Sequence, residues 1–390
     1  MNSKPELFTE GLIGTKKTAN RFVAQPMEAN DSINGGKVSE RAIERYKQLA
    51  RGKWGIIIIE AISVTEKSLA RINGLILDED NLNSFKVLVD EIKMINPEAV
   101  VLFQITHSGR NSGAAFSLRK SICPNPETGE EVFTTKEIDD ILNLFINAAA
   151  LSEKAGADGI DFKLCHGYFG GEMLRPNNNR DDKWGGSLEN RTLFLRKGIG
   201  RIKEKCSPGF IIGSRISIYE GIRGGLGTSS PDSIIEDLTE VSEIVKIMNE
   251  LGMDYINVSA GVPALTSMLT RPEKGSSLLY LNMLRYNNWV SGLLKNMGSD
   301  MKVIASAFSI LKEEGMAIAN ENIDNGNADF IGWGRQNFAD PLFPAKLKDN
   351  QEVNWCKICA GCSKLLRSQE HTGCIQFNDY YKQVFKGIKK

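Results

Sequence analysis

The chain has 390 residues, of which 41% are hydrophobic and 25% are charged, and this composition is ordinary for a folded globular protein. Its 48 Lys and Arg residues balance its 48 Asp and Glu residues, so its charge gives no reason to expect nucleic acid or a membrane surface as a partner. The first residues contain no apolar run of signal-peptide length, and runs such as residues 56–59 are too short to span a bilayer. We therefore expect a cytoplasmic protein.

Eight short runs rich in β-forming residues recur along the chain, each followed by a helical pattern. Several are apolar almost throughout, which is typical of parallel strands that are covered on both faces. The runs are residues 20–26, 54–60, 99–105, 159–163, 210–216, 255–259, 302–306 and 328–334. Eight βα units predict an α/β fold, a closed (β/α)8 TIM barrel. A doubly wound open sheet is the competing fold, but no Gly-x-Gly-x-x-Gly motif follows an early strand.

Two of the segments between these runs have clear helix patterns. Residues 135–155 start with Thr135 as the expected cap and an acidic first turn, and they carry apolar residues at helical spacing. Residues 231–251 repeat this pattern after two serines. Both segments are therefore expected to be helices on the outside of the barrel.

No low-complexity linker divides the chain. The residues before Asn20 are expected to form a short N-terminal hairpin. The eighth strand is followed by a segment that is rich in cysteine. We therefore expect one barrel domain over residues 1–350 and a Cys-rich C-terminal appendage, packed on the barrel, over residues 351–390.

Three proton-active side chains follow the fourth of these strands within six positions. Lys163, His166 and Tyr168 place an ammonium, an imidazole and a phenol at one strand end, and a Gly-Gly-Ser loop leads from there toward a helix. Barrel enzymes carry out their chemistry at the carboxyl ends of the strands. This arrangement favours an enzyme over a binding module.

The loops after the seventh and eighth strands suit a phosphate group. The seventh strand runs into the small residues 305–309, and the eighth ends in Gly334 and Arg335. Small residues let backbone N–H groups approach a phosphate, and an Arg can pair with it through two hydrogen bonds. Either loop alone could be only a tight turn, but together they indicate a phosphorylated cofactor.

Several longer motifs allow a family comparison. They are Gln25-Pro26-Met27, residues 104–110, His166-Gly167-Tyr168, residues 184–191, Arg215, and Gly334-Arg335 before Asp340-Pro341. With them the chain resembles the Old Yellow Enzyme family of NADH:flavin oxidoreductases, in the branch near 2,4-dienoyl-CoA reductase and trimethylamine dehydrogenase. The resemblance covers essentially the whole barrel. Because relatives with a second, FAD- and NADPH-binding module are far longer, it implies a barrel-only member.

The resemblance implies a non-covalently bound FMN and assigns residues to it. The expected cofactor-binding residues are Pro26, Met27, Glu28, Ala61, Gln104, Arg215, Ala307, Phe308, Gly334 and Arg335. Gln104 would bond the pyrimidine edge of the flavin, and Arg215 would lie by N1 and O2, where a cation stabilises the reduced form. The residues alone leave two alternatives open, a satisfied polar core residue for Gln104 and a buried ion pair for Arg215.

Tyr168 matches the proton donor of the family. In the implied reaction, hydride passes from the flavin to the β-carbon of an activated alkene, and a proton must reach the α-carbon. A phenol is neutral at pH 7 and can supply that proton. Lys163 and His166 would bind the oxygen of the substrate.

Two residues depart from the family pattern. Relatives present two His, or a His and an Asn, to the substrate oxygen, whereas this chain has Lys163, whose charge suits a carboxylate or a developing enolate. Lys163 could instead pair with Asp161 or Glu172. Relatives also have Thr or Cys where this chain has Glu28. A carboxylate there would disfavour the reduced flavin anion unless it is protonated or turned toward Lys163.

Four cysteines lie close together near the end of the chain. They are Cys356, Cys359, Cys362 and Cys374. Their spacing resembles the [4Fe–4S] signature of the dehydrogenase branch. Zinc is the second choice, with His371 as an alternative ligand, and four unligated thiols are the remaining alternative. With a cluster, electrons could enter from an external electron carrier instead of directly from NAD(P)H, the reductant otherwise expected.

These observations predict an FMN-dependent ene-reductase that acts on a small α,β-unsaturated carbonyl compound or carboxylate. An amine dehydrogenase is one alternative, but cations in the pocket would repel an ammonium substrate. A non-catalytic FMN electron-relay protein is another, but a relay needs no proton donor. The residues leave the oligomeric state open, a homo-oligomer included.

Overall fold

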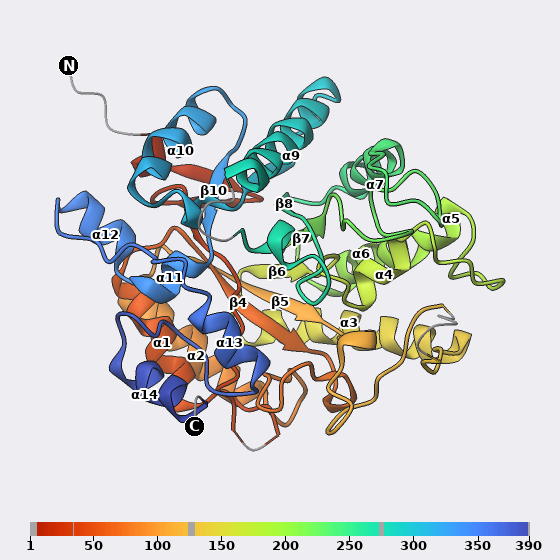
Figure 1. The fold of residues 1–390 in the computed structure, drawn as a ribbon, viewed down its shortest axis with the longest axis horizontal. Helices are drawn as coiled ribbons and strands as arrows, with labels where there is room; N and C mark the ends of the chain where they lie inside the picture. The colour runs from red at the N-terminus through yellow and green to blue at the C-terminus, as the bar shows by residue number, and fades with distance from the viewer. Residues whose placement is uncertain (1–5, 34, 124–128, 273–276, 389–390) are drawn as a thin grey trace.

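The computed structural model describes residues 6–33, 35–123, 129–272 and 277–388. Within these ranges, eight parallel strands close into a barrel in the order β10-β3-β4-β5-β6-β7-β8-β9 (Figure 1). The strands are β3 (Phe22–Ala24), β4 (Ile56–Ser63), β5 (Val100–Thr106), β6 (Gly159–Phe162), β7 (Ile211–Ser217), β8 (Tyr255–Ser259), β9 (Lys302–Ala305) and β10 (Phe330–Trp333). Each coincides with one of the eight predicted runs, so the (β/α)8 barrel is confirmed.

The apolar runs reflect burial on both faces of the strands. In β4, Ile56 and Ile58 belong to a cluster inside the barrel, whereas Ile57 and Ile59 pack in the layer between the strands and the outer helices. Alternating side chains of a strand point to opposite faces, so both sets had to be apolar. The predicted hairpin is also present, as β1 (Gly11–Ile13) pairs antiparallel with β2 (Lys16–Thr18). Its Ile13 joins the inner cluster.

Helices surround the strands (Figure 1). The longer ones are α1 (Glu40–Arg51), α2 (Leu82–Ile95), α3 (Thr135–Lys154), α6 (Leu193–Lys205), α7 (Thr239–Glu250), α9 (Ser277–Asn296) and α10 (Gly315–Asp324). Short helices in the loops are α4 (Phe169–Leu174), α5 (Leu188–Arg191), α8 (Ser267–Thr270), α11 (Arg335–Ala339) and α12 (Phe343–Lys348). No helix in the described part of the chain is long and apolar enough to cross a membrane.

Two predicted helix starts were wrong. The cap of α3 is Thr134, not Thr135, and its side chain and that of Glu137 form a capping box. The helix expected from residue 231 begins only at Thr239. The preceding segment forms turns instead, because its backbone bonds to the loop before it, as when the N–H of Asp237 donates to the carbonyl of Gly227.

The segment after the barrel packs against it. The segment contains the helices α13 (Gly361–Arg367) and α14 (Asp379–Ile388) (Figure 1). Helix α14 contacts α1, from the other end of the sequence, since the Arg41 guanidinium lies over the Tyr380 ring. The N–H of Cys356 donates to Gln336 Oε1 at 2.9 Å, and the N–H of Thr372 donates to the carbonyl of Ala29 at 2.7 Å. The division of the chain at residue 350 stays a prediction.

Candidate active site

A cavity of about 780 Å³ lies where the carboxyl ends of the barrel strands converge. It brings together eleven of the thirteen predicted catalytic and cofactor-binding residues, namely Pro26, Met27, Glu28, Gln104, Lys163, His166, Tyr168, Arg215, Ala307, Gly334 and Arg335. The other two do not line it. Ala61 is buried within β4, and the ring of Phe308 packs in the core, 5.8 Å from that of Trp333. Phe308 therefore offers the cavity at most its backbone.

Glu28 is held between a phenol and a guanidinium. The Tyr168 hydroxyl donates to Glu28 Oε1 at 3.1 Å, and Arg71 Nη2 lies 3.2 Å from Glu28 Oε2. Burial alone would raise the pKa of Glu28, but Arg71, Lys163 and the Tyr168 hydrogen bond outweigh it and lower that pKa. Burial and the neighbouring carboxylate both raise the pKa of Tyr168. In this pair the proton therefore rests on the phenol.

Lys163 covers one face of Tyr168. Its Nζ lies 3.5 Å from the centroid of the phenol ring, and burial lowers its pKa. The alternative pairing with Asp161 or Glu172 was wrong, because both carboxylates have other partners. Asp161 accepts from Gln104 Nε2 and the Tyr255 hydroxyl. Glu172 is engaged by Arg110 and Arg175. No described acidic side chain forms an ion pair with Lys163.

His166 is fixed from two directions. Its backbone has φ +65°, and Gly167 follows at φ +71°, so the chain turns sharply after β6. The N–H of His166 donates to Ser217 Oγ at 3.1 Å, and its Nε2 lies 2.8 Å from Ser259 Oγ. Burial is the main cause that lowers its pKa, so the ring is neutral. This turn explains why Lys163, His166 and Tyr168 all line one cavity.

Arg215 meets the cavity with a free nitrogen. Its Nη1 donates to Gln25 Oε1 at 2.9 Å, and Gln25 in turn bonds Asn257 and Ser306. The Nε of Arg215 is buried without a hydrogen-bond partner among the described residues. An unpaired donor of this kind is costly, and the expected FMN would supply an acceptor. Gln25 belongs to the Gln25-Pro26-Met27 motif, but it was not among the predicted site residues, so the role of its side chain was missed.

The part of the lining that follows β9 and β10 suits a phosphate. Ala307 has φ +80°, which turns its backbone at the end of β9. A Cβ on Gly334 would lie 3.2 Å from Met27 Sδ, so the loop leaves little room for a side chain there. Arg335 Nη2 donates to the carbonyl of Pro272 at 2.9 Å, and among the described residues its other donors have no hydrogen-bond partner. These features fit the phosphate of FMN.

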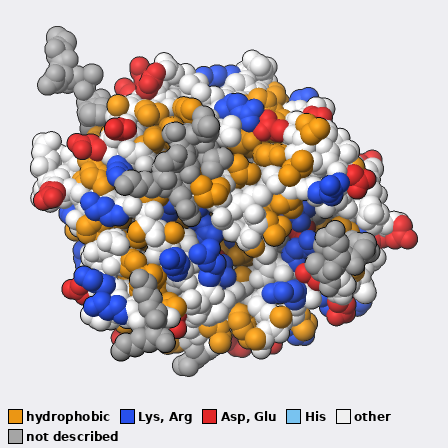
Figure 2. Space-filling view, in the orientation of Figure 1, with side chains coloured by type: hydrophobic (Ala, Val, Ile, Leu, Met, Phe, Trp, Pro, Cys, Tyr) orange, Lys and Arg blue, Asp and Glu red, His pale blue; other side chains and the backbone are white. Residues whose placement is uncertain are grey.

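Basic side chains dominate the lining. It includes nine Lys or Arg residues, Arg71, Arg110, Arg119, Lys163, Arg175, Arg215, Arg271, Arg335 and Arg367, against Glu28 and Glu130. Lys and Arg side chains gather near the middle of the face shown in Figure 2. A recess with such an excess favours anionic ligands. Arg71 and Arg271 lie outside any motif, so no sequence pattern marked them as site residues.

The four clustered cysteines are all free thiols. Burial, together with the other three thiols, raises the pKa of Cys362 to about 11, and Cys362 also lines the cavity. Across the described ranges, no group of three or more His, Cys, Asp or Glu side chains is arranged to hold a metal ion. The predicted [4Fe–4S] or zinc site therefore stays a prediction.

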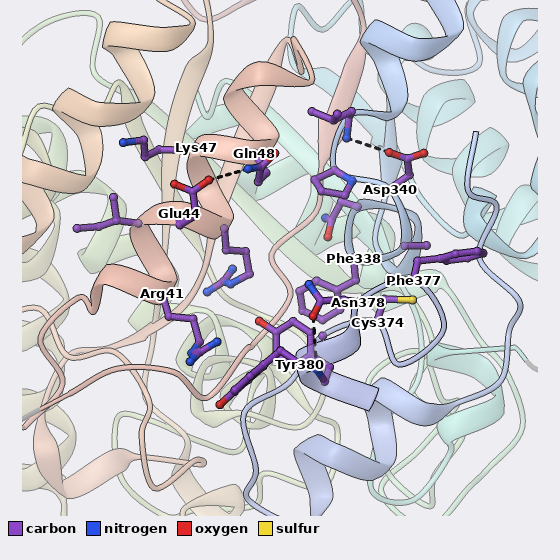
Figure 3. A pocket seen from close by; sticks show the side chains of 18 of the residues that line it. Arg41, Glu44, Lys47, Gln48, Phe338, Asp340, Cys374, Phe377, Asn378 and Tyr380 are labelled. Carbon is purple, nitrogen blue, oxygen red and sulfur yellow. Dashed lines mark hydrogen bonds between the residues drawn. The ribbon is translucent and has the colours of Figure 1, made fainter. Parts of the chain in front are cut away.

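A second cavity, of about 930 Å³, lies between α1 and the C-terminal segment (Figure 3). The Arg41 guanidinium lies 3.7 Å from the centroid of the Tyr380 ring. Gln48 Nε2 donates to Glu44 at 2.6 Å, and Lys346 lies 2.7 Å from Asp340. Within the described part of the chain, no buried side-chain donor that lines this cavity lacks a hydrogen-bond partner, in contrast to the barrel cavity.

Known proteins of several kinds are similar to this chain. Residues 6–354 match the NADH:flavin oxidoreductase / NADH oxidase family. The NADH oxidase of Thermoanaerobacter brockii is 30% identical over 374 residues, which are 93% of this chain and 54% of that protein. The cinnamate reductase of Clostridium sporogenes is 26% identical over 400 residues, 97% of this chain and 58% of that protein. The chain thus spans little more than half the length of these relatives.

Solved structures show the same fold. A 2-naphthoyl-CoA reductase bound to 2-naphthoyl-CoA has a TM-score of 0.81 at 21% identity, covering 97% of this chain and 58% of that one. A morphinone reductase mutant in complex with tetrahydroNAD has a TM-score of 0.71 at 17% identity, covering 90% of this chain and 92% of that one. At these identities the likeness concerns the barrel itself.

Proposed function

The chain belongs to the NADH:flavin oxidoreductase / NADH oxidase family, and from this membership we propose that it is an FMN-dependent ene-reductase. The observation that carries the proposal is Tyr168, a neutral phenol that lies beside the Lys163 ammonium in a predominantly basic cavity. A proton donor next to a cation is what the reduction of an activated alkene requires.

Two groups of lining residues support FMN as the ligand of the barrel cavity. Ala307, Gly334 and Arg335 would hold its phosphate, while Pro26 and Met27 would lie along the ring system. Arg215, whose buried Nε lacks a partner, would meet the ring where negative charge gathers on reduction. When bound, FMN supplies the hydride.

The other residues of the site would act on the substrate. Lys163 and His166 would bind an oxygen of the substrate and stabilise the negative charge that develops there. Tyr168 would then give its proton to the α-carbon.

An anionic acceptor fits the cavity better than a neutral one. Of the nine basic lining residues, Arg71, Arg110 and Arg175 form ion pairs with acidic side chains, and the other six have no ion-pair partner among the described residues. The names of two similar proteins, a cinnamate reductase and a 2-naphthoyl-CoA reductase, point to acidic or acyl-thioester acceptors. We propose a small unsaturated carboxylate or a related acyl compound as the substrate class.

The names of similar proteins also suggest which compound reduces the flavin. The relatives named NADH oxidase and NADPH dehydrogenase support NAD(P)H as the reductant. A [4Fe–4S] cluster at Cys356, Cys359, Cys362 and Cys374 would allow an external electron carrier instead. An amine dehydrogenase is disfavoured, because a basic cavity repels an ammonium substrate.

The test uses the full chain, loaded with FMN and reduced anaerobically with NADH or NADPH. Reduced protein is mixed with cinnamate or with the matching methyl ketone. In a separate assay, protein with reoxidised flavin is mixed with an aliphatic amine. We expect cinnamate to reoxidise the flavin and the saturated acid to form. Turnover of the amine alone, or of none of the three compounds by flavin-loaded protein, would refute the proposal.

A further inference from the structure

Three of the basic residues that line the barrel cavity form a group without acidic partners. Arg271 follows α8, Arg335 begins α11 and Arg367 ends α13. None of the three forms an ion pair with an acidic side chain in the described part of the chain. Burial is the main cause that lowers the pKa of Arg271, and the charges of Arg367 and Arg335 lower it further. Arg271 therefore lies near enough to both other guanidinium groups to be repelled by them.

One face of α13 turns toward the cavity. Cys362, Ser363, Leu366 and Arg367 line the cavity, and these positions lie three or four residues apart, as on one side of a helix. Ser363 Oγ accepts a hydrogen bond from Arg271 Nη1 at 2.9 Å. Helix α13 thus fixes Arg271 and also carries Arg367 to the same part of the lining.

Arg271 and Arg335 are anchored to different parts of the chain. Arg335 Nη2 donates to the carbonyl of Pro272 at 2.9 Å, whereas Arg271 Nη2 donates to the carbonyl of Pro263 at 3.3 Å. Arg271 thereby uses two of its five N–H groups, and Arg367 has no hydrogen-bond partner among the described residues. Because Arg335 is the expected partner of the FMN phosphate, Arg271 and Arg367 remain for another anion.

A phosphate group suits this pair of arginines. A guanidinium group can bind two phosphate oxygens at once, and a phosphate monoester carries about −1.5 to −2 charge at pH 7. Arg271 is half-buried, and a buried cation without a counter-ion is unfavourable, so a bound phosphate would offset its repulsion by Arg367. A carboxylate carries one charge only, and Lys163 already offers a cation for it beside Tyr168.

Resting on the function proposed above, we propose that Arg271 and Arg367 form a second anion site of the barrel cavity, which binds a phosphate group of a molecule that reacts with the flavin. This pair comes from the loop after β8 and from α13, which carry none of the proposed catalytic residues. Its role is to hold the reacting molecule, so its loss should weaken binding and leave the chemical step unchanged.

Two reacting molecules can bring such a phosphate. The nicotinamide dinucleotide that is expected as the reductant contains a pyrophosphate. An acyl thioester acceptor can carry phosphates on its thiol carrier. Both would have to enter the cavity to reach the flavin, so the same pair of arginines could serve either, and the kinetic measurement below tells them apart.

The first measurement needs no turnover. Inorganic pyrophosphate is titrated into the full chain with oxidised FMN bound, and its Kd is measured by calorimetry. Arg271→Gln and Arg367→Gln should each raise that Kd about tenfold and leave the Kd for FMN unchanged. Arg119→Gln is the matched control, because Arg119 also lines the cavity without an ion-pair partner but comes from the loop after β5.

Two results of this titration would overturn the proposal. An equal rise of the pyrophosphate Kd in Arg119→Gln would show that only the overall charge of the cavity matters. A matching rise of the Kd for FMN in Arg271→Gln would assign this side chain to the flavin phosphate instead.

The second measurement follows the two half-reactions by stopped flow. For the reductive half-reaction, NADH is compared with 1-benzyl-1,4-dihydronicotinamide, which has no phosphate. For the oxidative half-reaction, cinnamoyl-CoA is compared with the cinnamoyl thioester of N-acetylcysteamine, which has none either. In at least one half-reaction, Arg271→Gln and Arg367→Gln should raise the Kd of the phosphate-bearing compound about tenfold. The Kd of its phosphate-free partner and both limiting rates should stay the same.

The outcomes separate this proposal from the ene-reductase function. A wild type that reduces no alkene, but whose pyrophosphate and NADH binding depend on Arg271 and Arg367, refutes the ene-reductase function and keeps the anion site. Alkene reduction with unchanged discrimination between the paired compounds in both half-reactions refutes the anion site alone. Full FMN content and a wild-type Tm of each variant exclude a folding defect as the cause.

Discussion

The Nζ of Lys163 lies 3.5 Å from the centroid of the Tyr168 ring, so an ammonium covers one face of the phenol. The two residues are five positions apart, and the sharp turn at His166 and Gly167 brings them together. A cation over an aromatic face is favourable by about 0.5–2 kcal/mol. The contact gives the cavity a fixed positive charge next to its proton donor.

Lys163→His is expected to shift selectivity from enoates toward neutral enones. The ammonium attracts a carboxylate, whereas a neutral imidazole only donates a hydrogen bond, so the ratio of kcat/KM for cinnamate to that for the matching ketone should fall about tenfold, or 1.4 kcal/mol. Lys183→His, on the surface, serves as the control. Unchanged selectivity in a fully flavin-loaded Lys163→His protein would rule out anion binding by Lys163.

The preference for an enoate over the matching enone should also depend on pH. Burial is the main cause that lowers the pKa of Lys163, so its ammonium loses a proton below the ordinary lysine value of about 10.4. The charge is present below that lowered pKa and disappears above it. The enoate-to-enone ratio of the wild type should thus decrease as pH rises, while that of Lys163→Met stays flat. A ratio constant up to pH 10 would contradict this expectation.

Tyr168→Phe is expected to slow alkene reduction but not flavin reduction. Only the second half-reaction needs a proton at the α-carbon, and loss of such a donor usually lowers the rate by about 10²–10⁴-fold. Stopped-flow measurement of the two half-reactions separates them. If a weakly activated alkene reoxidises the variant at the wild-type rate, Tyr168 is not the donor.

Arg335→Ala is expected to weaken FMN retention. A charge-assisted hydrogen bond is worth about 1.5–3 kcal/mol, so the Kd for FMN should rise roughly ten- to a hundredfold. Arg201→Ala, which removes an exposed arginine bonded to Asn143, is the control. FMN release is followed by equilibrium dialysis of each protein. Equal Kd values would place the phosphate elsewhere.

The cysteine segment is expected to bind iron. Anaerobically prepared protein should contain about four irons per chain if a [4Fe–4S] cluster is fully loaded. Cys362→Ser should lower that content, whereas Cys206→Ser, outside the segment, should not. One zinc per chain without iron would replace the redox centre by a structural metal site.

The barrel could be predicted from local patterns alone. Runs such as residues 56–59 are apolar on both faces, and only strands covered on both sides bury every side chain. The residues at the end of the fourth predicted strand likewise indicated that Lys163, His166 and Tyr168 belong to a catalytic site. The start of α7 could not be predicted, because residues 231–238 bond to a loop whose position depends on the fold.

The sequence by itself determined the number of barrel strands. It also predicted eleven of the residues that line the barrel cavity. Only the tertiary structure decided which side chains meet there. Glu28 bonds Tyr168, 140 positions away, and Arg71, 43 positions away. The tertiary structure also shows that Ala61 and the ring of Phe308 do not line the cavity. Strand patterns depend on near neighbours in the chain, whereas such pairings exist only after closure of the barrel brings distant strand ends together.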